Sequence, residues 1–203
     1  MARSAFPVVL SAPSGTGKTT LAHLLVDSMN NLQISVSHTT RHARGHEQSD
    51  LDYFFVTPEI FDKMIQENAF IEWATVHGHR YGSSAEWTEA TLASEKDVLF
   101  DIDVQGGLQI KKHYPQAVLI FILPPSLDEL ETRLRNRGTD PEDLIEKRLL
   151  AARDEIRIGL DHYDYVINNE KLDRALFDLT SIVRTQRLAS FDRQKIRKRL
   201  LGE

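Results

Sequence analysis

The sequence predicts an α/β fold built on a parallel sheet that is covered by helices. Short runs rich in β-branched and aromatic residues alternate along the chain with segments of helical periodicity. The strongest runs, 98–103 and 117–123, are almost continuously apolar, which is typical of strands buried on both faces. A chain of 203 residues has room for one such domain with embedded subdomains.

The N-terminal half divides into a first strand–helix unit, a polar loop and an insert. The insert mixes strands with a short helix that begins at a proline, a residue favoured in the first helical turn. This pattern predicts a small mixed sheet separate from the parallel one. The elements predicted in this half are strands at 7–11, 34–37, 53–56 and 70–76, a helix from Lys18, a loop at 38–52 and a helix from Pro58 to about Glu67.

The C-terminal half is rich in charged helical segments. The longest, 127–159, is broken near Gly138, and Asp140 and Pro141 supply a cap and a first-turn proline for its second part. The remaining predicted elements are a strand at 165–168 and a helix from Leu172 whose basic end, 193–199, is expected to be frayed and solvated.

Composition excludes several function classes. Lys and Arg number 25 against 30 Asp and Glu, and the net charge of −5 makes a general nucleic-acid binder a poor interpretation. The absence of cysteine excludes a disulfide scaffold, a thiolate metal site and a cysteine nucleophile. No apolar run approaches the roughly 20 residues that span a bilayer, and the first residues do not resemble a signal peptide. We therefore expect a cytoplasmic protein without nucleic-acid or membrane partners.

The strongest chemical signal lies between the first strand and the first helix. Residues 12–19, APSGTGKT, match G-x-x-x-x-G-K-[ST] at every defining position but the first, where Ala12 replaces glycine. Such a loop turns backbone N–H groups and a helix N-terminus toward phosphate oxygens. Lys18 would reach the β- and γ-phosphates, and the Thr19 hydroxyl would ligate Mg²⁺. This phosphate loop predicts nucleoside triphosphate binding, and it tolerates Ala12 if the φ angle of that residue is negative.

A second group of residues suits a second nucleotide. Arg41 and Arg44 can bind phosphate oxygens bidentately, and Tyr53 and Tyr81 can add hydroxyl donors. Glu72 stands among apolar neighbours in a predicted strand, where a carboxylate is costly unless it is paired. A carboxylate can accept hydrogen bonds from two adjacent N–H groups of guanine, and adenine offers no such pair.

Two acids lie at the carboxyl end of the buried strand predicted at 98–103. Asp101 and Asp103 are two apart, which would point both to one face of the strand at the carboxyl end, where open α/β sheets bind ligands. The alternative is that they cap a helix at Gly106, and the sequence leaves both interpretations open. Arg133 and Arg137 are four apart on one helical face, which by itself is more typical of a solvated surface.

Taken together and in order, these motifs resemble the guanylate kinase family. The resemblance runs from about residue 8 to residue 173, and the combination is far more specific than the phosphate loop alone. The matching segments are 11–19, 35–41, 53–56, 70–74, 81–83, 101–106, 122–126 and 133–138.

The resemblance implies a P-loop NTPase core with a mixed α/β GMP-binding insert and a helical lid, in one domain of about 5–188. It also implies the reaction ATP + GMP ⇌ ADP + GDP with Mg²⁺ as cofactor. The expected boundaries are 1–37, 98–127 and 158–203 for the core, 38–97 for the insert and 128–157 for the lid.

Residue roles are likewise implied by the resemblance. The catalytic set is Lys18, Arg41, Arg133, Arg137 and Arg148. The ATP-binding set is Ser11, Ala12, Pro13, Ser14, Gly15, Thr16, Gly17, Lys18, Thr19, Thr20 and Asn169. The GMP-binding set is Ser37, Arg41, Arg44, Tyr53, Glu72, Tyr81, Ser83 and Asp103. The Mg²⁺ set is Thr19 and Asp101, the latter partly through water.

The chain departs from the family pattern at three positions. The family usually has proline in place of Ala43 and glycine in place of His46, and tyrosine is common in place of Arg80. The histidines at 77 and 79 are interpreted as loop residues rather than metal ligands. Two other functions are considered: a catalytically inactive guanylate kinase-like interaction module, and a small P-loop kinase with another acceptor. A homo-oligomer is left open.

Overall fold

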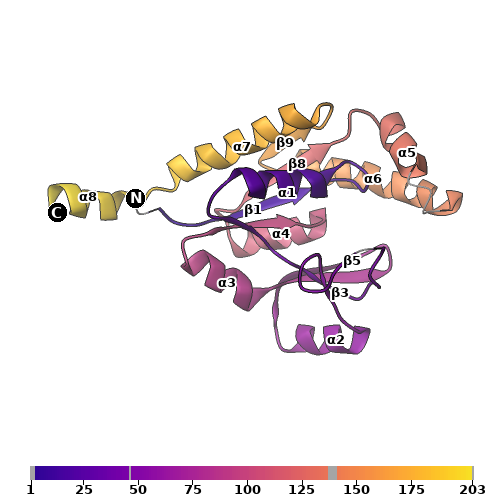
Figure 1. Ribbon diagram of the computed structural model, residues 1–203, viewed down its shortest axis with the longest axis horizontal. Helices are drawn as coiled ribbons and strands as arrows, with labels where there is room; N and C mark the ends of the chain where they lie inside the picture. Colours follow the sequence, from indigo (N-terminus) through magenta and orange to yellow (C-terminus); the bar gives the residue numbers. More distant parts are fainter. Residues whose placement is uncertain (1–2, 46, 137–140, 203) are drawn as a thin grey trace.

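The computed structural model describes residues 3–45, 47–136 and 141–202. Within those residues the centre is a five-stranded parallel sheet, which confirms the predicted fold class (Figure 1). Strand β1 lies in the middle and pairs with β7 on one side and β8 on the other. The strands in spatial order are β2 (Leu32–Ile34), β7 (Asp97–Asp101), β1 (Pro7–Ser11), β8 (Val118–Leu123) and β9 (Tyr165–Asn168).

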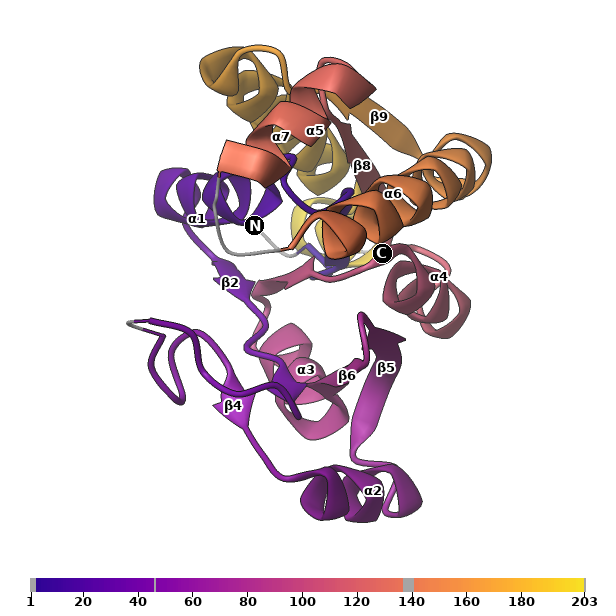
Figure 2. The same ribbon diagram turned by 90° about the vertical axis from the view of Figure 1, so that its right-hand side faces the viewer.

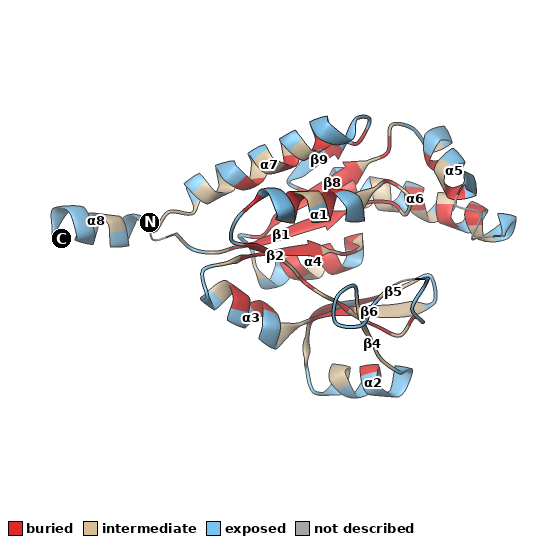
Figure 3. Ribbon diagram, in the orientation of Figure 1, coloured by how far each residue is buried: buried red, intermediate tan, exposed pale blue. Residues whose placement is uncertain are grey.

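Alternate side chains of the sheet enter two separate cores. Val8 and Leu10 of β1 point into one core and Val9 into the other, and all three are fully buried. Buried residues therefore follow the strands and the helix sides that face them (Figure 3). The helices are α1 (Lys18–Ser28) and α7 (Leu172–Ala189) over the first face, and α4 (Val104–His113) and α6 (Glu142–His162) over the second.

The insert forms a second, mixed sheet beside the first, as predicted (Figure 2). Its strand order is β4-β3-β6-β5; β3 pairs with β4 in parallel, and the other pairs are antiparallel. The exact boundaries expected for the insert, 38–97, stay a prediction. Its elements are β3 (His38–Thr39), β4 (Phe54–Phe55), α2 (Pro58–Gln66), β5 (Phe70–Val76), β6 (His79–Ser84) and α3 (Ala85–Ala93).

The strand predicted at 34–37 is misplaced, because β2 ends at Ile34 and residues 35–37 cross from one sheet to the other. The Ser35 N–H still donates to the Leu99 carbonyl of the first sheet (2.8 Å), whereas the Ser37 carbonyl accepts from the Phe54 N–H of the second (3.0 Å). Sequence analysis also missed β6 and α3. The β6 sequence, HRYGSS, has no β-branched residue, so its propensity gives little signal.

Helices α5 (Leu127–Asn136) and α6 pack on each other at one end of the molecule (Figure 1), and the helical lid expected at 128–157 stays a prediction. Pro141 occupies the capping position of α6, so the prediction that it lies in the first turn is wrong by one residue. The predicted cap Asp140 and the break at Gly138 lie outside the described residues. The buried residues that join the two helices are Leu130, Leu134, Ile145 and Ala152.

The basic C-terminal segment is a helix of its own, α8 (Arg193–Leu201), and not the frayed end of α7. Asp192 begins it, because the Asp192 carboxylate accepts a hydrogen bond from the Lys195 N–H (2.9 Å) in the manner of an N-cap. This helix extends away from the body of the molecule (Figure 1). Across the described parts of the chain, no helix combines the length and apolar character needed to cross a membrane.

Candidate active site

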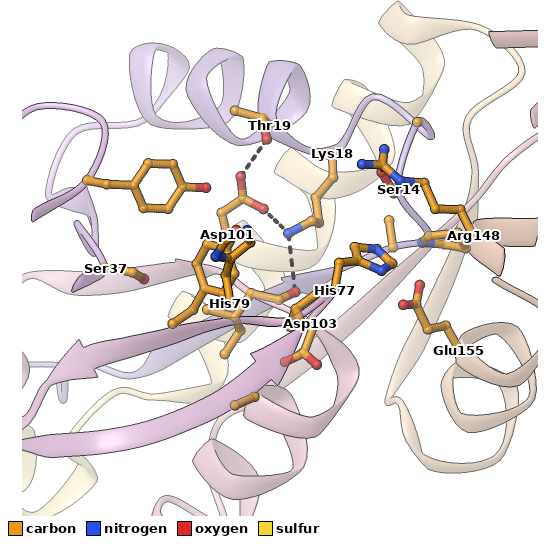
Figure 4. Close-up of a pocket in the computed structure, with 18 of the residues that line it drawn as sticks. Ser14, Lys18, Thr19, Ser37, His77, His79, Asp101, Asp103, Arg148 and Glu155 are labelled. Carbon is orange, nitrogen blue, oxygen red and sulfur yellow. Dashed lines mark hydrogen bonds and ion pairs between the residues drawn. The ribbon is translucent and has the colours of Figure 1, made fainter. Parts of the chain in front are cut away.

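A cavity of about 440 Å³ lies where the carboxyl ends of β1 and β7 face the second sheet and α6 (Figure 4). Leu10 pairs in register with Asp101, so the phosphate loop that follows β1 and the end of β7 form one wall. Open α/β sheets bind their ligands at this edge, and the volume is typical of small-molecule sites.

The phosphate loop has the backbone that its sequence predicts. Gly15 and Gly17 have φ angles of 96° and 95°, values that favour glycine. Gly17 is the residue before α1, so the loop leads directly into the helix N-terminus. Ala12 is not among the residues with positive φ, and its methyl group is therefore compatible with the loop.

The reactive end of the loop is linked to β7. The Lys18 ammonium forms an ion pair with Asp101 and donates to the Ile102 carbonyl (3.2 Å). The Thr19 hydroxyl donates to the other carboxylate oxygen of Asp101 (2.8 Å). Figure 4 shows these three side chains together at the cavity wall.

The chemistry of Thr19 and Asp101 fits Mg²⁺. Both offer oxygen atoms, which Mg²⁺ prefers, and it commonly takes one or two protein ligands together with phosphate oxygens and water. The described residues contain no cluster of three or more His, Cys, Asp or Glu that could hold a metal ion without a nucleotide.

The prediction that Asp101 and Asp103 lie on one strand is wrong for Asp103. β7 ends at Asp101, and Asp103 is the N-cap of α4, where its carboxylate accepts from the Gly106 N–H (3.0 Å). The capping alternative therefore holds for Asp103, whereas Asp101 is at the strand end. Both residues nevertheless line the cavity.

Glu72 lies on the floor of the cavity and is only 3% exposed. The Ser83 hydroxyl donates to its carboxylate (2.6 Å) and stands 3.3 Å from the Ser37 hydroxyl. Burial raises the pKa of the Glu72 carboxyl to about 7; the Ser83 hydrogen bond opposes this rise and the charge of Asp103 adds to it. A carboxylate held at this cost suits a ligand that brings hydrogen-bond donors.

The arginine pocket is assembled around two tyrosines. The Arg41 guanidinium lies over the Tyr53 ring, with Cζ 5.3 Å from the ring centroid, and its Nε donates to the Tyr81 hydroxyl (3.3 Å). Burial raises the pKa of the Tyr53 hydroxyl to about 12, so it remains a donor at neutral pH. Arg44, Tyr53 and Tyr81 line the cavity, whereas Arg41 is behind them and 6% exposed.

The lid arginines differ in position. Arg148 lies over the phosphate loop, with its Nη1 3.4 Å from the Ser14 hydroxyl, and it lines the cavity. Arg133 is not brought to the cavity, because its Nε is bonded to Glu129 (2.9 Å) one turn earlier on α5. Arg137 lies outside the described residues.

Three residues of the expected ATP-binding set are buried behind the phosphate loop. The Ser11 hydroxyl accepts from the Tyr163 hydroxyl (2.7 Å) and is fully buried. The Asn169 amide donates to the Thr16 carbonyl (2.8 Å), and the Thr16 side chain is itself buried. In this conformation these three residues support the loop from inside and do not line the cavity.

Comparison with known proteins decides the family. A family model described as guanylate kinase matches residues 4–186. The chain belongs to the guanylate kinase family. The guanylate kinase of Polaromonas sp. is 50% identical over 180 residues, covering 89% of this chain and 87% of the relative. That of Dechloromonas aromatica is 47% identical over 195 residues, covering 96% of each. The crystal structure of guanylate kinase from Anaplasma phagocytophilum has a TM-score of 0.83 at 30% identity, covering 99% of this chain and 97% of that one.

Sequence reasoning missed three titratable residues that line the cavity of this guanylate kinase family member. His77 and His79 belong to the β5–β6 hairpin and line the cavity with Glu155 of α6, and Figure 4 shows His77 on the side toward Arg148 and Glu155. His79 is two residues before Tyr81 in one strand, and Glu155 is seven after Arg148 in one helix, so each spacing predicts a shared face. Burial raises the pKa of the Glu155 carboxyl to about 7, with a further rise from the charge of Asp103.

Proposed function

We propose that this protein is an ATP:GMP phosphotransferase, which moves the γ-phosphoryl group of ATP to GMP and releases ADP and GDP. Membership of the guanylate kinase family supports this activity. The observation that carries it is that one cavity contains both the phosphate loop and a buried carboxylate, Glu72, on the opposite side. The cavity thus has a donor side and an acceptor side.

The donor side would bind ATP at the phosphate loop. Backbone N–H groups, the N-terminus of α1 and Lys18 would hold its phosphates. Thr19 and Asp101 would hold Mg²⁺, which offsets the negative charge of those phosphates when bound. Asn169 is assigned to the adenine side of this pocket by family resemblance, and its hydrogen bond to Thr16 also stabilises the loop.

The acceptor side would bind GMP. Arg41, Arg44 and the two tyrosines would hold the phosphate, because guanidinium and hydroxyl groups are its best side-chain donors. Glu72, Ser37 and Asp103 would hold the guanine, with Ser83 fixing the Glu72 carboxylate.

The attacking atom is an oxygen of the GMP phosphate, which is already anionic at neutral pH, so no strong general base is required. The protein must bring two polyanions together, neutralise charge and exclude water. Arg148 already lies beside the donor site. We propose that closure of a lid at 128–157 onto the insert at 38–97 adds Arg133 and Arg137 to the transferring group.

The test is release of ADP from ATP in the presence of each nucleoside monophosphate in turn. The proposal expects turnover with GMP that exceeds turnover with AMP, CMP and UMP by at least about tenfold. Preference for another acceptor would indicate a different P-loop kinase. Absence of turnover together with absence of ATP binding by calorimetry would indicate an interaction module.

A further inference from the structure

Glu47 carries no assigned role, yet it contacts the most buried arginine of the acceptor pocket. Its two carboxylate oxygens accept from Nη1 and Nη2 of Arg41 at 2.8 and 2.9 Å. One of them also accepts from the Arg44 N–H (2.7 Å), and the Glu47 N–H donates to the Arg44 carbonyl (3.0 Å). A single side chain therefore joins the Arg41 head group to the loop that carries Arg44.

The geometry divides the Arg41 guanidinium into two edges. A guanidinium has five N–H donors in a rigid plane, and a carboxylate or phosphate can bind two of them along one edge. Glu47 takes the end edge, formed by Nη1 and Nη2. The side edge, formed by Nε and the second N–H of Nη2, is turned toward Tyr81, whose hydroxyl accepts from Nε and whose side chain lines the cavity.

The ion pair between Arg41 and Glu47 keeps both side chains charged. The hydrogen bonds with Arg41 lower the pKa of the Glu47 carboxyl and raise that of the Arg41 guanidinium, so both remain charged at neutral pH. The Arg41 guanidinium also lies over the Tyr53 ring, with Cζ 5.3 Å from the ring centroid.

We propose that Glu47 is a positioning residue that holds the end edge of Arg41 and so directs its side edge at the acceptor phosphate. This inference rests on the proposed function. In this arrangement the phosphate of GMP replaces the Tyr81 hydroxyl as the acceptor from Nε of Arg41 and also accepts from Nη2, while Glu47 keeps its own hydrogen bonds. Glu47 does not touch the substrate, and its effect passes through Arg41 and the Arg44 backbone.

The variant Glu47→Gln tests the inference, because it keeps the shape of the side chain and replaces one acceptor oxygen by a donor. We expect the KM for GMP to rise about tenfold, while kcat and the KM for ATP stay within about twofold, since the loss concerns acceptor binding. The matched control is Asp62→Asn, which removes the Arg80 ion pair elsewhere in the insert and should change none of the three. Unfolding midpoints of both variants establish that they are folded.

A double-mutant cycle with Arg41→Lys separates positioning from a general charge effect. Lysine has no second edge to orient, so Glu47→Gln should raise the KM for GMP little in that background. If Glu47→Gln does not fold, Glu47→Asp replaces it, and a smaller but equally selective rise is expected.

Three results would overturn the inference: an unchanged KM for GMP, a lowered KM for GMP, which would make Glu47 a competitor of the phosphate, or a parallel loss in kcat and in both KM values. Each of these presupposes wild-type turnover with GMP. Absence of that turnover would instead overturn the proposed function.

Discussion

Ser83 donates a 2.6 Å hydrogen bond to Glu72, and this contact fixes the carboxylate on the cavity floor. The two residues lie on neighbouring strands, β5 and β6, and pair directly in register. The second carboxylate oxygen of Glu72 lies close to α4 at Gly106. A Cβ atom added at Gly106 would be only 2.5 Å from that oxygen, so the contact depends on glycine. The carboxylate is thus held between a strand partner and a helix that has no side chain at that point.

Glu72→Gln should weaken recognition of guanine. The amide replaces one acceptor with a donor that faces the donors of the base, so we expect the KM for GMP to rise about tenfold or more and the GMP/AMP preference to narrow. Steady-state kinetics with both nucleotides measure this. Glu67→Gln, at an exposed position of the same insert, is the control. A preference equal to that of the wild type would remove Glu72 from base recognition.

The pH dependence should follow the same carboxyl. In the proposed role Glu72 must be ionised to accept from two N–H groups of guanine, and the pKa of its carboxyl is raised to about 7. The value of kcat/KM for GMP should therefore fall as the pH drops through about 7, beyond any fall caused by the GMP phosphate or by Glu155. Subtracting the profile of Glu72→Gln, which retains those other groups, isolates the effect. Parallel profiles for the two proteins would contradict it.

Glu72 should cost stability at alkaline pH in the absence of ligand. The pKa of the Glu72 carboxyl is higher in the folded protein than its unfolded value near 4.5. The stabilisation of the folded state that results from this shift is fully present below pH 4.5 and is lost as the pH rises through about 7. Glu72→Gln has no such charge and should be more stable than the wild type at pH 8, by roughly 1–3 kcal/mol, and similar at pH 5. Denaturant titrations at the two pH values test this. A variant that is less stable than the wild type at pH 8 would show that the charge is fully compensated.

Gly106→Ala should displace the Glu72 carboxylate from α4. We expect the KM for GMP to rise while the KM for ATP stays within about twofold, since the phosphate loop is not touched. Gly107→Ala is the matched variant, because its methyl group would meet the Tyr163 hydroxyl instead of Glu72. Both substitutions overpack the interior and cost about 1–3 kcal/mol of stability. Only Gly106→Ala should raise the KM for GMP. An equal rise in both variants would contradict the contact between Gly106 and Glu72 as its cause.

Lys18→Ala should abolish most turnover without unfolding the protein. Removal of one cationic donor from a transferring phosphoryl group costs on the order of 10²–10³ in kcat. Lys112→Ala, on the exposed side of α4, should retain activity. Turnover assays measure the loss of activity, and circular dichroism shows whether each variant is folded. Activity of Lys18→Ala close to the wild type would exclude Lys18 from the catalytic set.

Sequence analysis identified the parts of the site that depend on local backbone. The phosphate loop follows from glycine positions and a strand–helix junction, and the Glu72 strand from its apolar neighbours. Local pattern also identified Asp101, because it ends a buried strand.

What the sequence could not show depends on tertiary contacts. Glu47 matters through a partner six residues away, a relationship that a loop sequence does not encode. Asp103 caps a helix because β7 ends two residues earlier than its apolar run suggests. Arg133 lies in a segment that resembles the lid of the family. Its position relative to the cavity depends on how α5 packs, and in this conformation it pairs with Glu129.

The central claim is that two nucleotides meet in one cavity, with the acceptor base on Glu72. A crystal structure with GMP and a non-hydrolysable ATP analogue tests it most directly. The account predicts the guanine edge against the Glu72 carboxylate, the GMP phosphate between Arg41 and Arg44, and the analogue on the phosphate loop. An empty acceptor side, or GMP bound with its base away from Glu72, would contradict it.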